Sequence, residues 1–276
     1  MAKSRFHYHA QAVGLAGHIT FPFDQVIDVQ APSALPTSGG RCNAHKESFN
    51  LGDIVSHSAA HTQTSGNYDE NLDAYVTVAT ATVENYNLRN ILKVKKIVAQ
   101  LTSTYPAGKG DEPSISPKGS YFEGLEIAGR AIELESHVDT YMRLDTRQKL
   151  REHYKNNQQF RASLDQATFM GGHESLPENV RGYFPWSRQR STGELPENRG
   201  TAIVPLFVIK NASAPGFEVY GNVVYVHDFG RIHLGELVIG PYERRLTMVH
   251  VDLGSPVKGS LTAASVGGNG GETDPL

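Results

Sequence analysis

The sequence predicts an all-β or β-dominated fold, a sandwich or barrel of roughly ten antiparallel strands with a short helical insertion. Runs rich in valine, isoleucine and threonine recur along the chain. Short segments rich in glycine, proline and asparagine separate these runs. Because such connections are too short for the helical crossovers between parallel strands, antiparallel pairing should dominate. Helix formers gather in one region, around residues 140–165.

The clearest strand pair lies in the first half of the chain. Residues 75–83 are rich in valine and threonine, and a second apolar run covers residues 91–104 after a turn expected at 86–90. Lys93, Lys95 and Lys96 mark a solvated face of this second strand. We therefore expect an antiparallel hairpin. Weaker strand candidates cover residues 6–23, 53–64 and 119–131.

The C-terminal third repeats this pattern with shorter strands and turns. A glycine interrupts one of the strands at Gly221, and residues 240–243 form a turn of Gly, Pro, Tyr and Glu. Successive strands joined by short turns are typical of a meander. The strands expected here cover residues 203–210, 217–226, 232–239 and 246–253.

Three segments depart from the strand pattern. Asp145 precedes the helix formers of residues 147–154 and is a capping residue type, so one or two short helices are expected nearby. Residues 171–200 are rich in glycine, proline and arginine and are interpreted as a long loop. Residues 258–276 are small, polar and glycine-rich, which favours a flexible tail; the alternative is a tail held in place, for example by a neighbouring subunit. The expected organisation is one β-rich domain over residues 1–257, with a helical and loop insertion at about 137–200, and a tail over 258–276.

Composition excludes several classes of function. The formal net charge of −3 lacks the basic excess of nucleic-acid-binding proteins, so no nucleic-acid partner is expected. No run approaches the roughly 18 apolar residues of a membrane helix, and the N-terminus lacks the apolar core of a signal peptide. Cys42 is the single cysteine and cannot form an internal disulfide. These observations predict a cytoplasmic protein without a membrane partner.

Motifs of the common enzyme classes are absent from the sequence. It contains no G-x-S-x-G elbow, no phosphate-binding loop, no G-x-G-x-x-G after a strand and no H-E-x-x-H helix. Cys42 follows Arg41, a cation that would lower a thiol pKa, but an unreactive thiol is the favoured interpretation. The sequence therefore favours a non-catalytic structural or interaction protein over an enzyme.

Histidines supply the alternative hypothesis, a metal-dependent enzyme or a small-ligand-binding β-barrel. The chain has 12 histidines. His7 and His9 are two apart and share one face if they lie on a strand. His227 and His233 flank a predicted hairpin turn, and His250 follows on a later strand. If three of these side chains converge, they would form a divalent metal site; otherwise no cofactor is expected.

The long loop supplies the candidate partner-binding site. It contains the single tryptophan, surrounded by other aromatic residues and arginines, the residue types that dominate binding hot spots. The alternative is that these rings fold back onto the core. We expect a homo-oligomer or a protein partner, contacted through Tyr183, Phe184, Trp186, Arg188 and Arg190.

Several runs are similar to runs in bacterial proteins of uncharacterised function. They consist of turns and strand ends rather than catalytic motifs. The resemblance therefore implies a β-rich fold and carries over no activity, cofactor or site residue. The runs are residues 80–84, 90–92, 97–101, 229–236, 245–248 and 253–257.

Overall fold

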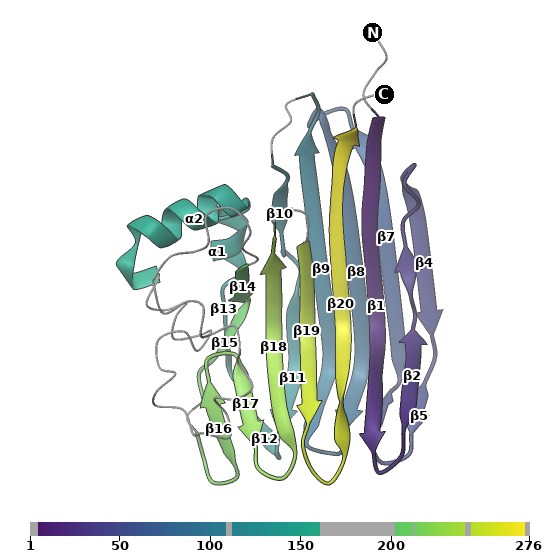
Figure 1. Cartoon of the computed structure of the whole chain (residues 1–276), viewed down its shortest axis with the longest axis vertical. Coiled ribbons are helices and arrows are strands. Elements are labelled where there is room, and N and C mark those ends of the chain that lie inside the picture. The colour runs from purple at the N-terminus through teal and green to yellow at the C-terminus, as the bar shows by residue number, and fades with distance from the viewer. Residues whose placement is uncertain (1–4, 109–111, 161–201, 212, 241–243, 274–276) are drawn as a thin grey trace.

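Two large antiparallel sheets pack face to face in the computed structural model (Figure 1). The β-dominated fold is confirmed, and it is a sandwich rather than a closed barrel because each sheet ends in edge strands. The described ranges contain twenty strands, more than the roughly ten predicted, because many of them are short. The structure describes residues 5–108, 112–160, 202–211, 213–240 and 244–273.

The first sheet, called sheet A, carries the C-terminal strands and the N-terminal strand side by side. The predicted meander is confirmed for three of its four strands, which become β16 to β19 and are consecutive in the sheet. The strand predicted at 203–210 is not part of it, since it is split into β14, which pairs with β18, and β15 (Phe207–Ile209), which pairs outside this sheet. Its strand at 217–226 is split in two at Gly221 and Asn222. The order is β16 (Phe217–Tyr220), β17 (Val223–Val226), β18 (Gly230–Ile239), β19 (Arg244–Leu253), β20 (Lys258–Thr273), β1 (Arg5–Phe21) and β2 (Gln25–Gln30), with β14 (Ala202–Pro205) on β18 and β3 (Ser33–Ala34) on β1.

The second sheet, called sheet B, is built around the predicted hairpin. Its two long strands pair along their whole length, from Ala74 opposite Pro106 to Leu88 opposite Leu92. The turn comes later than predicted, at Arg89 and Asn90, which both have positive φ. The order is β12 (Arg130–Ala131), β11 (Tyr121–Ile127), β9 (Leu92–Pro106), β8 (Ala74–Leu88), β6 (Val55–His57) and β5 (Phe49–Leu51), with β10 (Ser114–Ser116) on β9, β7 (Ala59–Asp69) on β8 and β4 (Gly40–Lys46) on β7.

The hydrophobic core fills the space between the two sheets. Strands β1 and β20 of sheet A pack over β8 and β9 of sheet B (Figure 1). Side chains that alternate along each strand place every second residue in this core. On β8, Ala79, Ala81 and Val83 are fully buried, while the residues between them are less buried. Leu15 and Ile19 of β1 meet them from the opposite sheet. Burial of these apolar side chains is the main stabilising contribution.

Helices α1 (Val138–Arg143) and α2 (Arg147–Asn156) lie at one side of the sandwich, as the sequence predicted for this region (Figure 1). The capping residue is Thr146 rather than Asp145, since the Lys149 backbone N–H donates to the Thr146 hydroxyl at 3.2 Å. A two-stranded sheet of β13 (Leu134–Ser136) and β15 (Phe207–Ile209) adjoins them. No helix in the described ranges is long and apolar enough to span a membrane.

The expected flexible tail is wrong over most of its length. Residues 258–273 form β20, which lies between β19 and β1 inside sheet A. Its glycines reflect close packing rather than flexibility: a Cβ on Gly270 would lie 2.3 Å from Cζ of Phe6. The Phe6 ring in turn stacks on Tyr75 of sheet B, with ring centroids 4.1 Å apart. A residue without a side chain is therefore needed where the two sheets meet.

Candidate functional site

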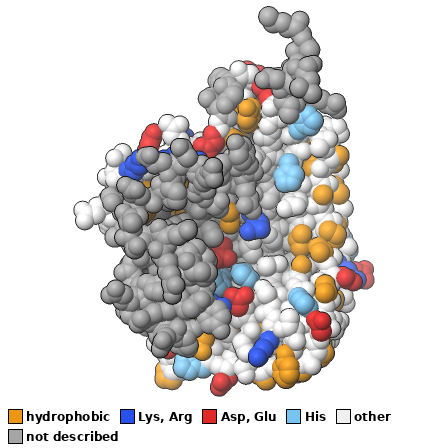
Figure 2. Space-filling model, viewed as in Figure 1, with side chains coloured by type: hydrophobic (Ala, Val, Ile, Leu, Met, Phe, Trp, Pro, Cys, Tyr) orange, Lys and Arg blue, Asp and Glu red, His pale blue; other side chains and the backbone are white. Residues whose placement is uncertain are grey.

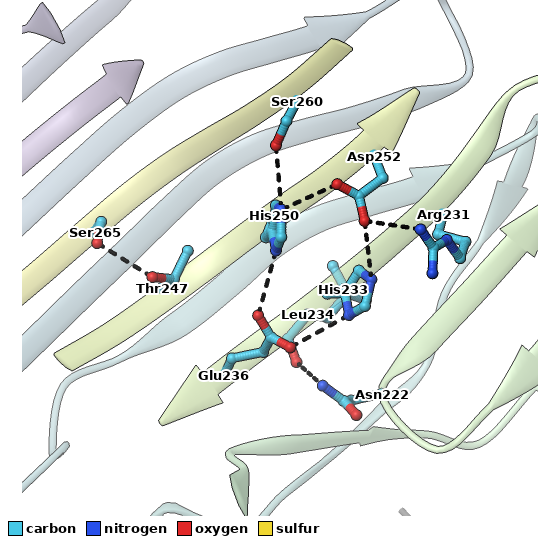
Figure 3. A network of polar contacts seen from close by, with 10 residues as sticks. All are labelled: Asn222, Arg231, His233, Leu234, Glu236, Thr247, His250, Asp252, Ser260 and Ser265. Carbon is cyan, nitrogen blue, oxygen red and sulfur yellow. Dashed lines mark hydrogen bonds and ion pairs between the residues drawn. The ribbon is translucent and has the colours of Figure 1, made fainter. Parts of the chain in front are cut away.

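A cluster of polar side chains lies where β18 and β19 pair (Figure 3). His233 and His250 are directly opposite in the register of these strands, and their rings stack with centroids 5.2 Å apart. Leu234 and Leu237 of β18 belong to the hydrophobic core, so the histidines occupy the other, outer face of sheet A. The His233 side chain is nevertheless only 7% exposed.

Two carboxylates join the imidazoles into a closed arrangement, called here the His–acid ring and made of His233, Glu236, His250 and Asp252. Glu236 lies between the two Nδ1 atoms, 3.2 Å from that of His233 and 3.6 Å from that of His250. Asp252 lies between the two Nε2 atoms, 3.3 Å from that of His250 and 3.9 Å from that of His233. Each carboxylate therefore contacts both rings.

Neighbouring side chains extend the network on three strands. The Arg231 guanidinium donates to Asp252 Oδ2 at 3.1 Å, and the Ser260 hydroxyl of β20 lies 3.2 Å from His250 Nε2. The Asn222 amide donates to the Leu234 carbonyl at 3.1 Å (Figure 3). The cluster thus ties together β18, β19 and β20 by their outer faces.

A glycine explains why Glu236 reaches His233, three residues away. Neighbouring side chains on a regular strand alternate between faces, so positions 233 and 236 would point to opposite sides. Gly235 has φ of +63°, and both Leu234 and Leu237 are in the core. The alternation is therefore shifted by one residue at Gly235, which turns Glu236 onto the face of the histidines.

Electrostatics fix the charges in the His–acid ring. Burial alone would raise the pKa of Glu236, but hydrogen bonds from His233 and His250 outweigh it and hold the pKa far below its usual range. The hydrogen bond with His250 likewise lowers the pKa of Asp252, against the effect of burial. Hydrogen bonds with Asp252 and then Glu236 raise the pKa of His250 to about 9. At neutral pH both carboxylates are ionised and His250 is protonated.

The order Ser260–His250–Glu236 resembles the hydroxyl, imidazole and carboxylate of a nucleophilic site. A general base must be unprotonated to accept the hydroxyl proton. With its pKa raised to about 9, His250 is already protonated at neutral pH and is instead a donor. The geometry therefore supports a charge-balanced contact between strands better than activation of Ser260.

The structure brings together two of the five histidines predicted as metal ligands, His233 and His250. His7 and His9 lie exposed on β1, and His227 follows β17, where its Nε2 is 3.5 Å from Glu218 Oε1. Within the described residues, no group of three or more His, Cys, Asp and Glu side chains could hold a metal ion.

Sequence reasoning missed Arg231, Asp252 and Ser260. A signal was present: β18 and β19 pair symmetrically about the predicted turn at 240–243, which places position 233 opposite position 250. The shifted alternation at Gly235, which brings Glu236 to the histidines, has no comparable signal in the sequence. The predicted partner-binding residues lie outside the described residues: Tyr183, Phe184, Trp186, Arg188 and Arg190.

A second feature is the open edge of sheet A at β2, whose only partner among the described strands is β1. Exposed large apolar side chains concentrate here: Phe21 is 53% exposed, Phe23 43%, Val26 65% and Val29 47%. Figure 2 shows orange side chains gathered on the right of the visible face, over β1 and β2. Exposed apolar patches of this kind mark interaction sites.

Residues 6–240 match a family model described as a domain of unknown function (DUF8256). The match ends before β19 and β20, which supply His250, Asp252 and Ser260. No curated protein and no solved structure matches the chain.

Proposed function

We propose that this chain, which belongs to the DUF8256 family of domains of unknown function, is a non-catalytic interaction protein that self-assembles through the β2 edge. The observation that carries the proposal is the exposed apolar character of this edge. Among the residues that the structure describes, four of the seven exposed large hydrophobic side chains fall within residues 21–29. An open strand edge also presents unpaired backbone N–H and C=O groups, which pair readily with a strand of another chain.

The sequence of β2 favours a second copy of this chain as the partner. Directly opposite residues of an antiparallel pair point to the same face, so a two-fold axis between two copies of β2 must pass through a pair of equivalent residues. With the axis at Ile27, Val26 lies opposite Asp28 of the second copy. The carboxylate then does not meet its own equivalent, which avoids a like-charge contact.

The flanking residues enlarge the contact beyond six residues of strand. A stable interface buries roughly 800 Å² per partner, more than a short edge strand alone supplies. Phe21 at the end of β1 and Phe23 in the turn before β2 are both exposed. Pairing would remove these rings and the two valines from water, with a gain of roughly 25 cal/mol per Å² of apolar area before the costs of association.

The test is the mass of the protein in solution, measured by light scattering over a range of concentrations up to about 100 µM. We expect a dimer for the wild-type chain and at least a tenfold weaker dimer for Val26→Lys. Leu72→Lys is the matched control, since Leu72 is similarly exposed at 61% but lies in the β7–β8 turn. A monomeric wild type, or a dimer unaffected by Val26→Lys, would overturn the proposal.

Disulfide trapping tests the register, in a Cys42→Ser background. Residues opposite each other in antiparallel strands have Cα atoms about 4.5–5.5 Å apart, within disulfide range. Mixed Val26→Cys and Asp28→Cys chains should therefore cross-link. Val26→Cys alone should not, because two copies of position 26 are offset by two residues, about 6.6 Å along the strand, which together with the spacing between strands exceeds disulfide range. Efficient cross-linking of Val26→Cys alone would contradict the proposed register.

We place the protein in the bacterial cytoplasm as part of the same proposal. Its single cysteine and its resemblance to uncharacterised bacterial proteins favour this location. Cys42 lies half-buried in β4 without a second cysteine to pair with. No catalytic activity is proposed, because His250 in the His–acid ring is protonated at neutral pH.

A further inference from the structure

Two histidines outside the His–acid ring form a pair on sheet B. His45 of the edge strand β4 lies directly opposite His61 of β7 in the strand register. Both side chains are exposed, and their rings stack with centroids 4.2 Å apart at 28° between planes. The two Nδ1 atoms are 2.9 Å apart and share a hydrogen bond, which a bound metal ion would replace. The sheet therefore presents two imidazole nitrogens close together and open to solvent.

The spacing of these nitrogens suits one metal ion. An imidazole nitrogen binds Zn²⁺ at about 2.0–2.1 Å, and two such bonds at a right angle place the nitrogens about 2.9 Å apart. A right angle between neighbouring ligands is typical of square-planar and octahedral coordination. The outer torsion of a histidine is soft, so exposed rings turn easily to aim both lone pairs at one point. Water would fill the remaining positions.

We propose that His45 and His61 form a two-imidazole site for a divalent transition-metal ion, with Cu²⁺ bound most tightly. Imidazole ligands suit Cu²⁺, Ni²⁺ and Zn²⁺ rather than Mg²⁺ or Ca²⁺, and the general affinity order places Cu²⁺ first.

The other histidine pairs of the described chain do not offer the same geometry. His7 and His9 are neighbours along one strand, which separates their Cα atoms by about 6.6 Å. His233 and His250 direct their nitrogens at Glu236 and Asp252, and His250 is protonated at neutral pH. A cross-strand pair is closer than a pair along a strand, and the Nδ1 atoms of His45 and His61 lie beside each other rather than beside carboxylates.

The experiment is a calorimetric titration of the full-length chain, without an affinity tag, with Cu²⁺ in a weakly coordinating buffer. We expect one strong site in the wild type and at least a tenfold weaker affinity in His45→Gln and in His61→Gln. The double variant should be no weaker than either single variant, because one lost ligand already removes the chelate. His7→Gln is the matched control and should stay within about twofold of the wild type.

Electron paramagnetic resonance of the Cu²⁺ complex gives an independent readout, since hyperfine coupling counts the bound nitrogens. The wild type should show two equatorial imidazole nitrogens, and each single variant one or none. Circular dichroism should show that all variants stay folded, as expected for exposed positions. Equal Cu²⁺ affinity in the wild type and in His45→Gln and His61→Gln, or no strong site in the wild type, would overturn the proposal.

Discussion

The imidazole of His250 lies 3.3 Å from the carboxylate of Asp252, two residues along the same strand. This contact, followed by that with Glu236, raises the folded-state pKa of His250 to about 9, against about 6.5 for an ordinary histidine. Its contribution to stability is therefore fully present below pH 6.5 and is lost as the pH rises to about 9.

Urea unfolding at pH 6 and pH 9.5 measures this contribution of His250 to stability. The unfolding free energy should fall by roughly 1–3 kcal/mol in the wild type over this range. His250→Gln should remove most of the fall. His9→Gln, an exposed histidine on β1, is the control and should keep it. An equal fall in His250→Gln would show that other groups cause it.

Glu236 is the residue on which both imidazoles depend, and its side chain is only 17% exposed. Glu236→Gln would leave each imidazole with one carboxylate partner, Asp252, and with a neutral amide beside its Nδ1. We expect a loss of roughly 1–3 kcal/mol in unfolding free energy at neutral pH. The pKa of His250, followed by NMR, should also fall from its raised value.

The stabilisation by Glu236 depends on pH in the opposite direction to the stabilisation by His250. Because the folded-state pKa of Glu236 is lowered, its stabilisation is present above the usual carboxyl pKa and declines as the pH falls below it. Glu236→Gln should therefore flatten the acid limb of the stability profile. Glu123→Gln is the control, since Glu123 pairs with Lys95 on an exposed face and should change little.

His57 in β6 is a buried histidine that weakens the fold in acid. Its side chain is 3% exposed, and neither ring nitrogen has a hydrogen-bond partner in the described part of the chain. Burial, helped by Lys46, lowers its pKa. The unfolded state therefore takes up more protons below pH 6.5, and stability falls as the pH drops through this range.

His57→Leu should raise the unfolding free energy by about 1–2 kcal/mol at neutral pH, because a buried polar ring is replaced by an apolar side chain of similar volume. The gain should be larger at pH 5 than at pH 8. Thermal unfolding at both pH values measures it, with His9→Leu as an exposed control. A loss of stability at both values would mean that the ring makes contacts a leucine cannot replace.

Sequence patterns predicted those parts of the fold that depend on local signals. The hairpin of β8 and β9 and the meander ending in β19 follow from alternation and turn residues, which act over a few positions. The pairing of His233 with His250 could have been found from the turn between β18 and β19. The shift at Gly235, which adds Glu236, depends on a backbone conformation that the sequence does not specify.

Long-range packing explains why the prediction of a flexible C-terminal tail was wrong. A glycine-rich run is flexible when it is alone in solvent, and this rule led to the expected tail. In β20 the same residues pair with β1 from Arg5 opposite Thr273 onwards, a contact between opposite ends of the sequence. Only the position of the Phe6 ring reveals why Gly270 is a glycine.

Two neighbouring glycines of β20 give a matched test of this explanation. A Cβ on Gly270 would lie 2.3 Å and 2.6 Å from two carbons of the Phe6 ring, whereas a Cβ on Gly271 would meet nothing within 4 Å. Gly270→Ala should lower the unfolding free energy by roughly 1–3 kcal/mol, because the stacked ring must move. Gly271→Ala should be neutral or slightly stabilising, since it restricts the unfolded chain.

Shortening the ring residue separates this clash from a general effect of alanine in the strand. Phe6→Leu removes the ring atoms nearest to Gly270 and should itself destabilise the protein, because a buried aromatic contact with Tyr75 is lost. In the double variant Phe6→Leu, Gly270→Ala, the alanine should cost at least 1 kcal/mol less than it does in the wild type, by chemical unfolding. Additive losses would show that the Phe6 ring is not what requires a glycine at position 270.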